Sequence, residues 1–101
     1  MIVAFSVTPL GIGQDVGRAV AEAVRVVRAS GLPNSTDAMF TLVEGEWDEV
    51  MALVSACFKR MSEDCNRIST SIRIDYRAGK SGRLESKVEA IESRLGRKVS
   101  T

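Results

Sequence analysis

The stretch Ser35-Thr36-Asp37-Ala38-Met39-Phe40-Thr41-Leu42-Val43-Glu44 decides how many strands the sheet of this protein has. The pattern indicates an extended chain between two helical patterns. A bend near Met39 divides the stretch into two strands, whereas an unbent stretch forms one. We favour the bend, because a sheet of four strands covers two helices better than a sheet of three.

Two further stretches predict strands. Ile2 to Leu10 is rich in Val, Ile, Phe and Thr and stops at Pro9. Asn66 to Tyr76 alternates with a period of two, which is typical of a strand with one buried face. The residues expected to face the helices are Val3, Phe5, Val7, Ile68, Thr70, Ile72 and Ile74. Those expected on the opposite face are Ile2, Ala4, Ser6, Thr8, Ser69, Ser71, Arg73 and Asp75.

Three stretches place apolar residues at helical spacing. The first starts at Asp15 and ends at Gly31, and the second opens at Gly45 with carboxylates in its first turn. Trp47 in the second helix is expected to anchor the core. The third helix is shorter. The apolar positions are Val16, Val20, Ala23, Val24 and Val27 in the first, Trp47, Val50, Met51, Val54, Phe58 and Met61 in the second, and Leu84, Val88, Ile91 and Leu95 in the third.

The order of these elements predicts an α+β fold. With the bend, it is a ferredoxin-like βαββαβ sandwich that has an antiparallel four-stranded sheet and an additional C-terminal helix. A chain of 101 residues has the length of one domain. We expect that domain to span residues 1–95 and residues 96–101 to form a frayed C-terminal tail.

Composition excludes several classes of function. Lys and Arg number 14 against 13 Asp and Glu, so a net charge of +1 provides no broad basic surface for nucleic acid or an anionic membrane. The chain has no histidine, which excludes His-dependent catalysis and most zinc sites. Cys57 and Cys65 are expected to be buried, reduced thiols. Without a signal peptide or a membrane-spanning run, we expect a cytoplasmic protein.

Two glycine-rich stretches look like phosphate loops but lack the required spacing. After Gly11-Ile12-Gly13 the next glycine, Gly17, comes one place too late for a dinucleotide-binding loop, so a plain turn is favoured over a ligand-contacting loop. Gly79-Lys80-Ser81 lacks the first glycine of a nucleotide-binding loop and indicates a flexible basic loop. No cofactor or metal is expected.

The polar strand face carries the candidate binding residues. Small hydroxyls such as Ser6 and Ser71 suit a flat polar ligand, although the same face is also compatible with a solvated surface or a subunit contact. Glu44 either accepts hydrogen bonds from an amino-substituted heterocycle or bonds backbone amides at a helix start. No spacing brings two carboxylates together for acid/base chemistry, so we do not expect an enzyme.

Three blocks of the sequence carry a family resemblance. They are Ile2-Val3-Ala4-Phe5-Ser6-Val7-Thr8-Pro9-Leu10-Gly11, Thr41-Leu42-Val43-Glu44-Gly45-Glu46-Trp47-Asp48-Glu49-Val50 and Arg67-Ile68-Ser69-Thr70-Ser71-Ile72-Arg73-Ile74-Asp75. In this order, over about Ile2 to Leu95, they resemble the small thiamine-binding protein family. The resemblance implies a ferredoxin-like fold, assembly as dimers or tetramers, and non-catalytic binding of thiamine (vitamin B1) or its hydroxymethylpyrimidine portion.

The resemblance also implies a set of ligand-binding residues. An aminopyrimidine needs hydrogen-bonding groups at its edge and apolar walls on its faces. The candidates are Ser6, Thr8, Leu10, Met39, Phe40, Thr41, Glu44, Ser69 and Ser71. Phe40 stands where the family is expected to have a small residue, and its ring is expected to narrow or reshape the pocket.

Two functions follow as expectations. The first is sequestration or delivery of thiamine or a related pyrimidine by a homo-oligomer. The alternative is a structural or regulatory oligomer without a small-molecule ligand. Binding of single-stranded nucleic acid on the sheet is not expected, because only 5% of the residues are aromatic.

Overall fold

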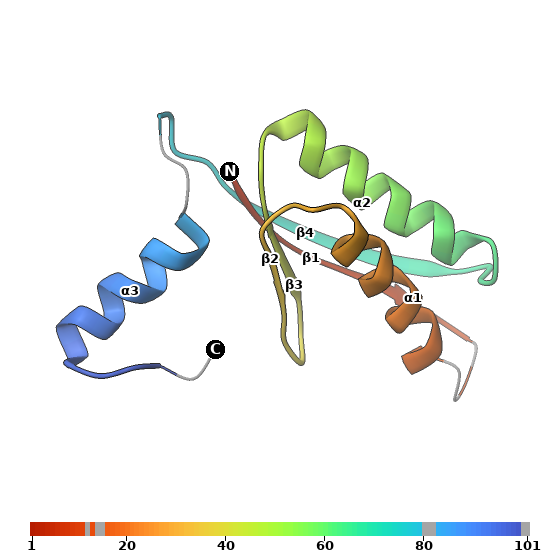
Figure 1. The fold of residues 1–101 in the computed structure, drawn as a ribbon. Coiled ribbons are helices and arrows are strands. Elements are labelled where there is room, and N and C mark those ends of the chain that lie inside the picture. Colours follow the sequence, from red (N-terminus) through yellow and green to blue (C-terminus); the bar gives the residue numbers. More distant parts are fainter. Residues whose placement is uncertain (12, 14–15, 80–82, 100–101) are drawn as a thin grey trace.

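The computed structural model describes residues 1–11, 13, 16–79 and 83–99. The sheet is antiparallel throughout, with its strands in the order β2-β3-β1-β4, and α1 and α2 cover one of its faces (Figure 1). This is the ferredoxin-like arrangement, and the bend near Met39 is confirmed as the turn between β2 and β3. The elements are β1 (Ile2–Pro9), α1 (Val16–Ala29), β2 (Asn34–Thr36), β3 (Thr41–Glu44), α2 (Trp47–Ser62), β4 (Ile68–Asp75) and α3 (Arg83–Leu95).

Local sequence explains where the helices begin and end. Gly31 adopts a positive φ of 78° after α1, a conformation that glycine reaches without steric cost. Glu46 caps α2 in a capping box, and its own N–H donates to the Glu49 carboxylate over 3.1 Å. Because Glu46 is the cap, the helix starts at Trp47 rather than at the predicted Gly45. The predicted start of α1 at Asp15 lies outside the described residues.

The core lies between the sheet and the two helices. Val3, Val43, Val50 and Cys57 have no exposed surface, and Phe5 is 3% exposed. Pairing of Val3 with Ile74 and of Phe5 with Ile72 places these residues on the predicted common face of β1 and β4. The predicted burial of that face of β4 is wrong, because Ile72 and Ile74 are 42% and 39% exposed at the edge of the sheet. Hydrophobic burial on this face holds the two helices to the sheet.

The predicted core stripe of α2 is partly wrong. Trp47 and Phe58 are 55% and 45% exposed, so Trp47 does not anchor the core. At 3.6 residues per turn, these two lie to one side of the arc that faces the sheet. That arc also includes Leu53 and Cys57, which the predicted stripe omitted. The buried residues of α2 are Val50, Leu53, Val54, Cys57 and Met61.

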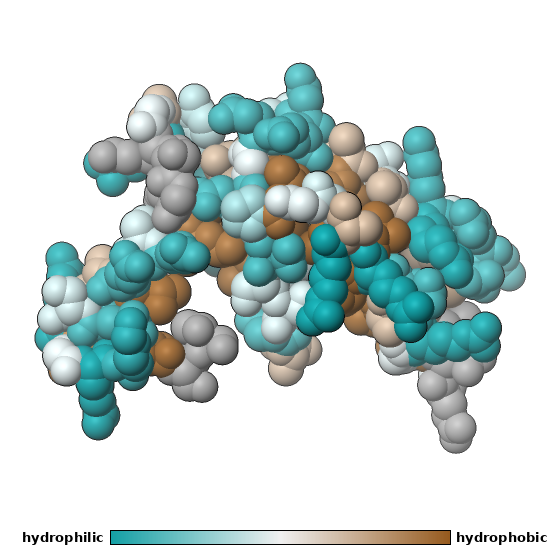
Figure 2. Space-filling model, viewed as in Figure 1, coloured by the Kyte–Doolittle hydropathy of each residue, from teal (hydrophilic) through white to brown (hydrophobic). Residues whose placement is uncertain are grey.

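Helix α3 projects from the rest of the molecule (Figure 1). Leu84 and Val88 are half-buried, whereas Ile91 and Leu95 are 53% and 62% exposed. Figure 2 shows apolar atoms on the side of α3 that faces the body of the molecule. The apolar stripe predicted for this helix is thus only half covered within one chain.

The predicted C-terminal tail and the two glycine-rich stretches lie only partly within the described residues. The chain after α3 turns back, and the N–H of Val99 donates to the Glu92 carboxylate over 2.7 Å. Residues 100–101, Ile12 of the first glycine-rich stretch, and Lys80 and Ser81 of the second lie outside the described residues.

Cys57 provides a test of the packing between α1 and α2. Its thiol lies 3.6 Å from the Ala23 carbonyl, to which it donates, and burial raises its pKa from 9.0 to about 11. The resulting contribution to stability is present at lower pH and is lost as the pH rises from 9.0 through about 11. At pH 8 we expect Cys57 to react with a thiol reagent at least about 100-fold more slowly in the folded protein than in urea. Equal rates would show that this interface is open.

Candidate functional site

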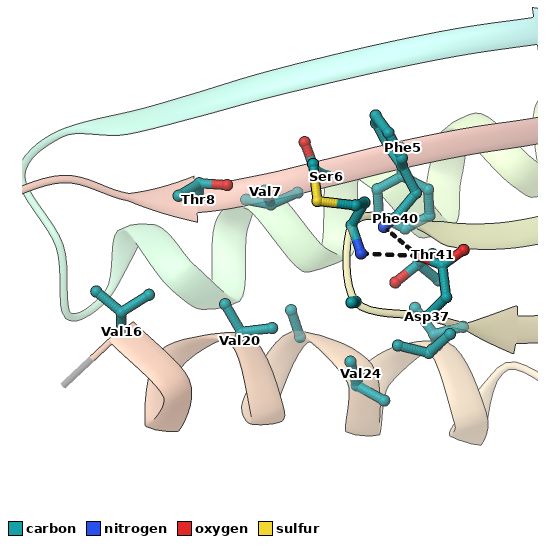
Figure 3. Close-up of a pocket in the computed structure, with 15 residues that line it drawn as sticks. Phe5, Ser6, Val7, Thr8, Val16, Val20, Val24, Asp37, Phe40 and Thr41 are labelled. Carbon is teal, nitrogen blue, oxygen red and sulfur yellow. Dashed lines mark hydrogen bonds between the residues drawn. The ribbon is translucent and has the colours of Figure 1, made fainter. Parts of the chain in front are cut away.

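A cleft of about 220 Å³ opens between α1, the second half of β1 and the β2–β3 hairpin. Figure 3 shows Val16, Val20 and Val24 on α1 facing the strand segment that carries Ser6, Val7 and Thr8. The hairpin closes one side. The lining residues are Phe5, Ser6, Val7, Thr8, Val16, Val20, Ala23, Val24, Val27, Thr36, Asp37, Ala38, Met39, Phe40 and Thr41.

The cleft exists because β3 is shorter than β1. Strand β1 pairs with β4 along its whole length, but its pairing with β3 covers only Ile2 to Phe5. The other edge of β1 from Ser6 to Pro9 is therefore left without a strand. The valines of α1 above this gap have no sheet to pack against, which leaves Val16 and Val20 at 37% and 36% exposure.

This finding corrects the apolar face predicted for α1. Of the five residues expected in the core, only Ala23 and Val27 are buried. Val16, Val20 and Val24 keep the predicted helical spacing but form a wall of the cleft. Spacing alone does not distinguish an apolar residue that faces the core from one that faces a cavity.

A side-chain cap shapes the hairpin turn. The Asp37 N–H donates to the Phe40 carbonyl over 3.0 Å. Oδ1 of Asp37 accepts the N–H groups of Met39 over 2.7 Å and of Phe40 over 2.8 Å. This cap presents Met39, which is 74% exposed, and Phe40, which is 38% exposed, at the rim of the cleft.

Sequence reasoning missed Asp37 as a site residue. An aspartate two residues before the expected bend was the available signal, because aspartate side chains accept N–H groups two positions further along in turns. Its carboxylate places a negative charge at the rim of a cleft whose other described lining residues are uncharged.

The cap makes the hairpin sensitive to acid. The N–H groups of Phe40 and Met39 hold the pKa of Asp37 below its ordinary value. The contribution to stability is present above the ordinary pKa and is lost as the pH falls through the lowered pKa. In an NMR titration we expect the Asp37 carboxyl resonance and the two amide resonances to share one midpoint below that of aspartate in the urea-unfolded chain. A midpoint equal to the unfolded value would rule out the cap.

Five of the nine residues predicted to bind a ligand line the cleft. They are Ser6, Thr8, Met39, Phe40 and Thr41. Ser6 and Thr8 lie on the part of β1 that borders the cleft. Because side chains alternate along a strand, their side chains lie on the sheet face that points away from the helices. On that face their partners in register are Ser71 and Ser69, which are exposed and do not line the cleft.

The remaining predicted residues lie at the ends of strands. Leu10 follows β1, is 37% exposed and donates its N–H to the Arg67 carbonyl over 2.9 Å. Glu44 ends β3, is 6% exposed and accepts the Leu84 N–H over 3.4 Å. Of the two roles considered for Glu44, the structure shows a bond to a backbone amide at a helix start. That helix is α3 rather than the adjacent α2.

Residues 1–11, 13, 16–79 and 83–99 contain no group of three or more His, Cys, Asp or Glu side chains placed to hold a metal ion. In the same ranges, none of the helices combines the length and the apolar character needed to cross a membrane.

Comparison with known proteins identifies relatives along nearly the whole chain. The family model described as thiamine-binding protein matches residues 3–92. The protein Mb1933 of Mycobacterium bovis, of the UPF0045 group, is 50% identical over 96 residues, which cover 94% of each chain. The UPF0045 protein sll0230 of Synechocystis is 36% identical over 94% of this chain and 79% of its own.

Solved structures share the fold. The crystal structure of MJ1052 from Methanocaldococcus jannaschii has a TM-score of 0.82 and 32% identity, over 89% of this chain and 93% of its own. The structure of TM0486 from Thermotoga maritima, a candidate thiamine biosynthesis/salvage protein, has a TM-score of 0.80 and 24% identity, over 89% and 96%. The match of the family model over most of the chain, together with the 50% identity to Mb1933, shows that the chain belongs to the thiamine-binding protein family.

Proposed function

We propose that this protein binds thiamine or a related hydroxymethylpyrimidine in the cleft between α1, β1 and the β2–β3 hairpin. The observation that carries the proposal is a cleft with apolar walls and a polar edge in a chain of the thiamine-binding family. The relationship of the fold to TM0486 adds support. Binding serves sequestration or delivery of the ligand.

The walls of the cleft suit an aromatic ring. Val20 and Val24 on one side and Phe40 on the other offer apolar contacts for its two faces. The volume of about 220 Å³ lies below the ~300–1,000 Å³ of pockets for drug-sized ligands. It therefore favours the pyrimidine half of thiamine, with the thiazolium ring nearer the opening and the Asp37 carboxylate at the rim.

The lining supports binding without catalysis. Asp37 is the single titratable side chain among the described residues of the cleft, and the chain has no histidine. General acid–base catalysis needs a donor and an acceptor placed on the reacting groups. One carboxylate already held by two backbone N–H groups is a poor substitute for such a pair.

Self-association in the cytoplasm is part of this proposal. Ile91 and Leu95 on α3, and Trp47 and Phe58 on α2, expose apolar surface that one chain leaves uncovered. Such surface on a small domain marks a protein contact. A homo-oligomer, as a dimer or a tetramer, covers it. The same observation favours the second candidate function, a structural or regulatory oligomer without a ligand.

Calorimetric titration distinguishes the two functions. Thiamine and hydroxymethylpyrimidine are titrated separately into the full chain, whose mass has been fixed by light scattering. We expect saturable binding of at least one ligand, micromolar or tighter, at a whole-number ratio per subunit. Absence of heat with both ligands on an intact oligomer would reject the binding function and favour the structural one.

A further inference from the structure

The pairing register leaves one backbone position of β1 facing the cleft. In an antiparallel pair, the N–H and C=O of one residue point to the same neighbouring strand, and successive residues alternate. Leu10 donates its N–H to the Arg67 carbonyl over 2.9 Å, so even-numbered residues of β1 point toward β4. Gly45 donates its N–H to the Met1 carbonyl over 3.1 Å, so odd-numbered residues point toward β3.

Val7 is the first odd-numbered residue of β1 that lies beyond the end of its pairing with β3. The last pair between the strands is Phe5 with Thr41, and the same register would place Met39 opposite Val7. Met39 lies in the hairpin turn, where its N–H donates to Asp37 Oδ1. Among the described residues, the hairpin supplies no backbone partner for Val7.

The edge of the cleft therefore presents one N–H donor beside one C=O acceptor. Val7 as a whole residue is only 7% exposed, and the backbone groups of such a residue are normally paired. The valines of α1 and the ring of Phe40 flank the same space. An unpaired N–H and C=O between apolar walls suit a planar molecule that has a hydrogen-bond acceptor next to a donor along one edge.

We propose that the backbone of Val7 recognises the aminopyrimidine edge of the ligand. The Val7 N–H donates to the ring nitrogen next to the amino group, and the amino group donates to the Val7 carbonyl. This inference rests on the proposed function and adds which edge of the ligand is recognised. The specificity is for heterocycles with an amino group beside a ring nitrogen.

An added strand is the other kind of occupant for an open edge, and the sequence opposes it. Pro9, the next odd-numbered residue, has no N–H, so the edge offers a single complete donor–acceptor couple. Proline on an exposed edge is a feature that discourages strand pairing.

Removal of the amino group from the ligand tests the proposal. The affinity of the full chain for hydroxymethylpyrimidine is compared with that for the same pyrimidine carrying hydrogen in place of the amino group. We expect at least about 30-fold weaker binding of the second ligand, because the Val7 carbonyl is left without a donor. Equal affinities would overturn recognition by Val7 while keeping the binding function. If neither ligand binds, the proposed function itself fails.

Amide hydrogen exchange tests the residue directly, without any substitution. In the free protein, we expect the Val7 N–H to exchange faster than the N–H of Phe5, which faces β3, and that of Thr8, which faces β4. Saturating hydroxymethylpyrimidine should slow the exchange of the Val7 N–H by at least about tenfold and change the exchange of the Phe5 and Thr8 N–H groups little. If the Val7 N–H exchanges as slowly as the Phe5 N–H in the free protein, a strand or another chain covers the edge. That result would overturn the proposal. Unchanged exchange on saturation would also overturn it.

Discussion

Replacing Val20 with tryptophan is expected to weaken the binding of hydroxymethylpyrimidine at least about 100-fold, which corresponds to about 2.7 kcal/mol. Val20 lines the cleft and is 36% exposed, so a larger side chain can extend into the open space without displacing the core. The cleft holds only about 220 Å³, and an indole ring competes with the ligand for it. Calorimetry measures the affinity, and thermal unfolding checks that the fold is intact.

The neighbouring residue on α1 provides the matched control. Ala21 is exposed and does not line the cleft, so Ala21→Trp adds an indole ring on the solvent side of the same helix. We expect this variant to keep the wild-type affinity, and both variants to keep the unfolding midpoint within about 3 °C. Wild-type affinity in Val20→Trp would exclude this cleft as the binding site.

Replacing Phe5 with alanine is expected to lower the free energy of unfolding by about 3–5 kcal/mol. Phe5 is 3% exposed and lies where the core meets the cleft, so its loss leaves a cavity that its neighbours cannot fill. Small domains have a total stability of ~5–15 kcal/mol, so the variant should lose much of it. Urea unfolding at a fixed protein concentration measures the change, because self-association also contributes to stability.

Phe40→Ala is the control for this substitution. It removes the same side chain from the rim of the cleft, where Phe40 is 38% exposed. We expect a cost of at most about 1.5 kcal/mol, since less apolar surface returns to water. Equal costs for the two variants would contradict the position of Phe5 in the core.

The parts of the fold that follow from local spacing could be predicted. Alternation in Asn66 to Tyr76 correctly predicted which residues of β4 share a face, although it did not predict that Ile72 and Ile74 stay exposed. Helical spacing located all three helices to within a few residues. Trp47 was assigned to the core because it fits the stripe, yet the residues that face the sheet are set by how α2 docks. Docking depends on contacts between distant segments, which one-dimensional spacing does not contain.

The lining of the cleft was predicted in part for the same reason. The polar strand face pointed to Ser6 and Thr8, and the family resemblance added Met39, Phe40 and Thr41, all of which line the cleft. The other four predicted residues, Leu10, Glu44, Ser69 and Ser71, do not line the cleft. The cleft itself arises from the unequal lengths of β1 and β3, and the sequence holds no local mark of where their pairing stops.

Mapping of the bound ligand by NMR determines whether the cleft between α1, β1 and the β2–β3 hairpin is the binding site. The full chain, labelled with ¹⁵N, is titrated with hydroxymethylpyrimidine, and the backbone amide shifts are followed to saturation. We expect saturable shifts concentrated in three segments that surround the cleft, Ser6 to Thr8, Val16 to Val24 and Asp37 to Thr41. Saturable shifts confined to the opposite sheet face at Ser69 and Ser71, or to α3, would contradict this expectation.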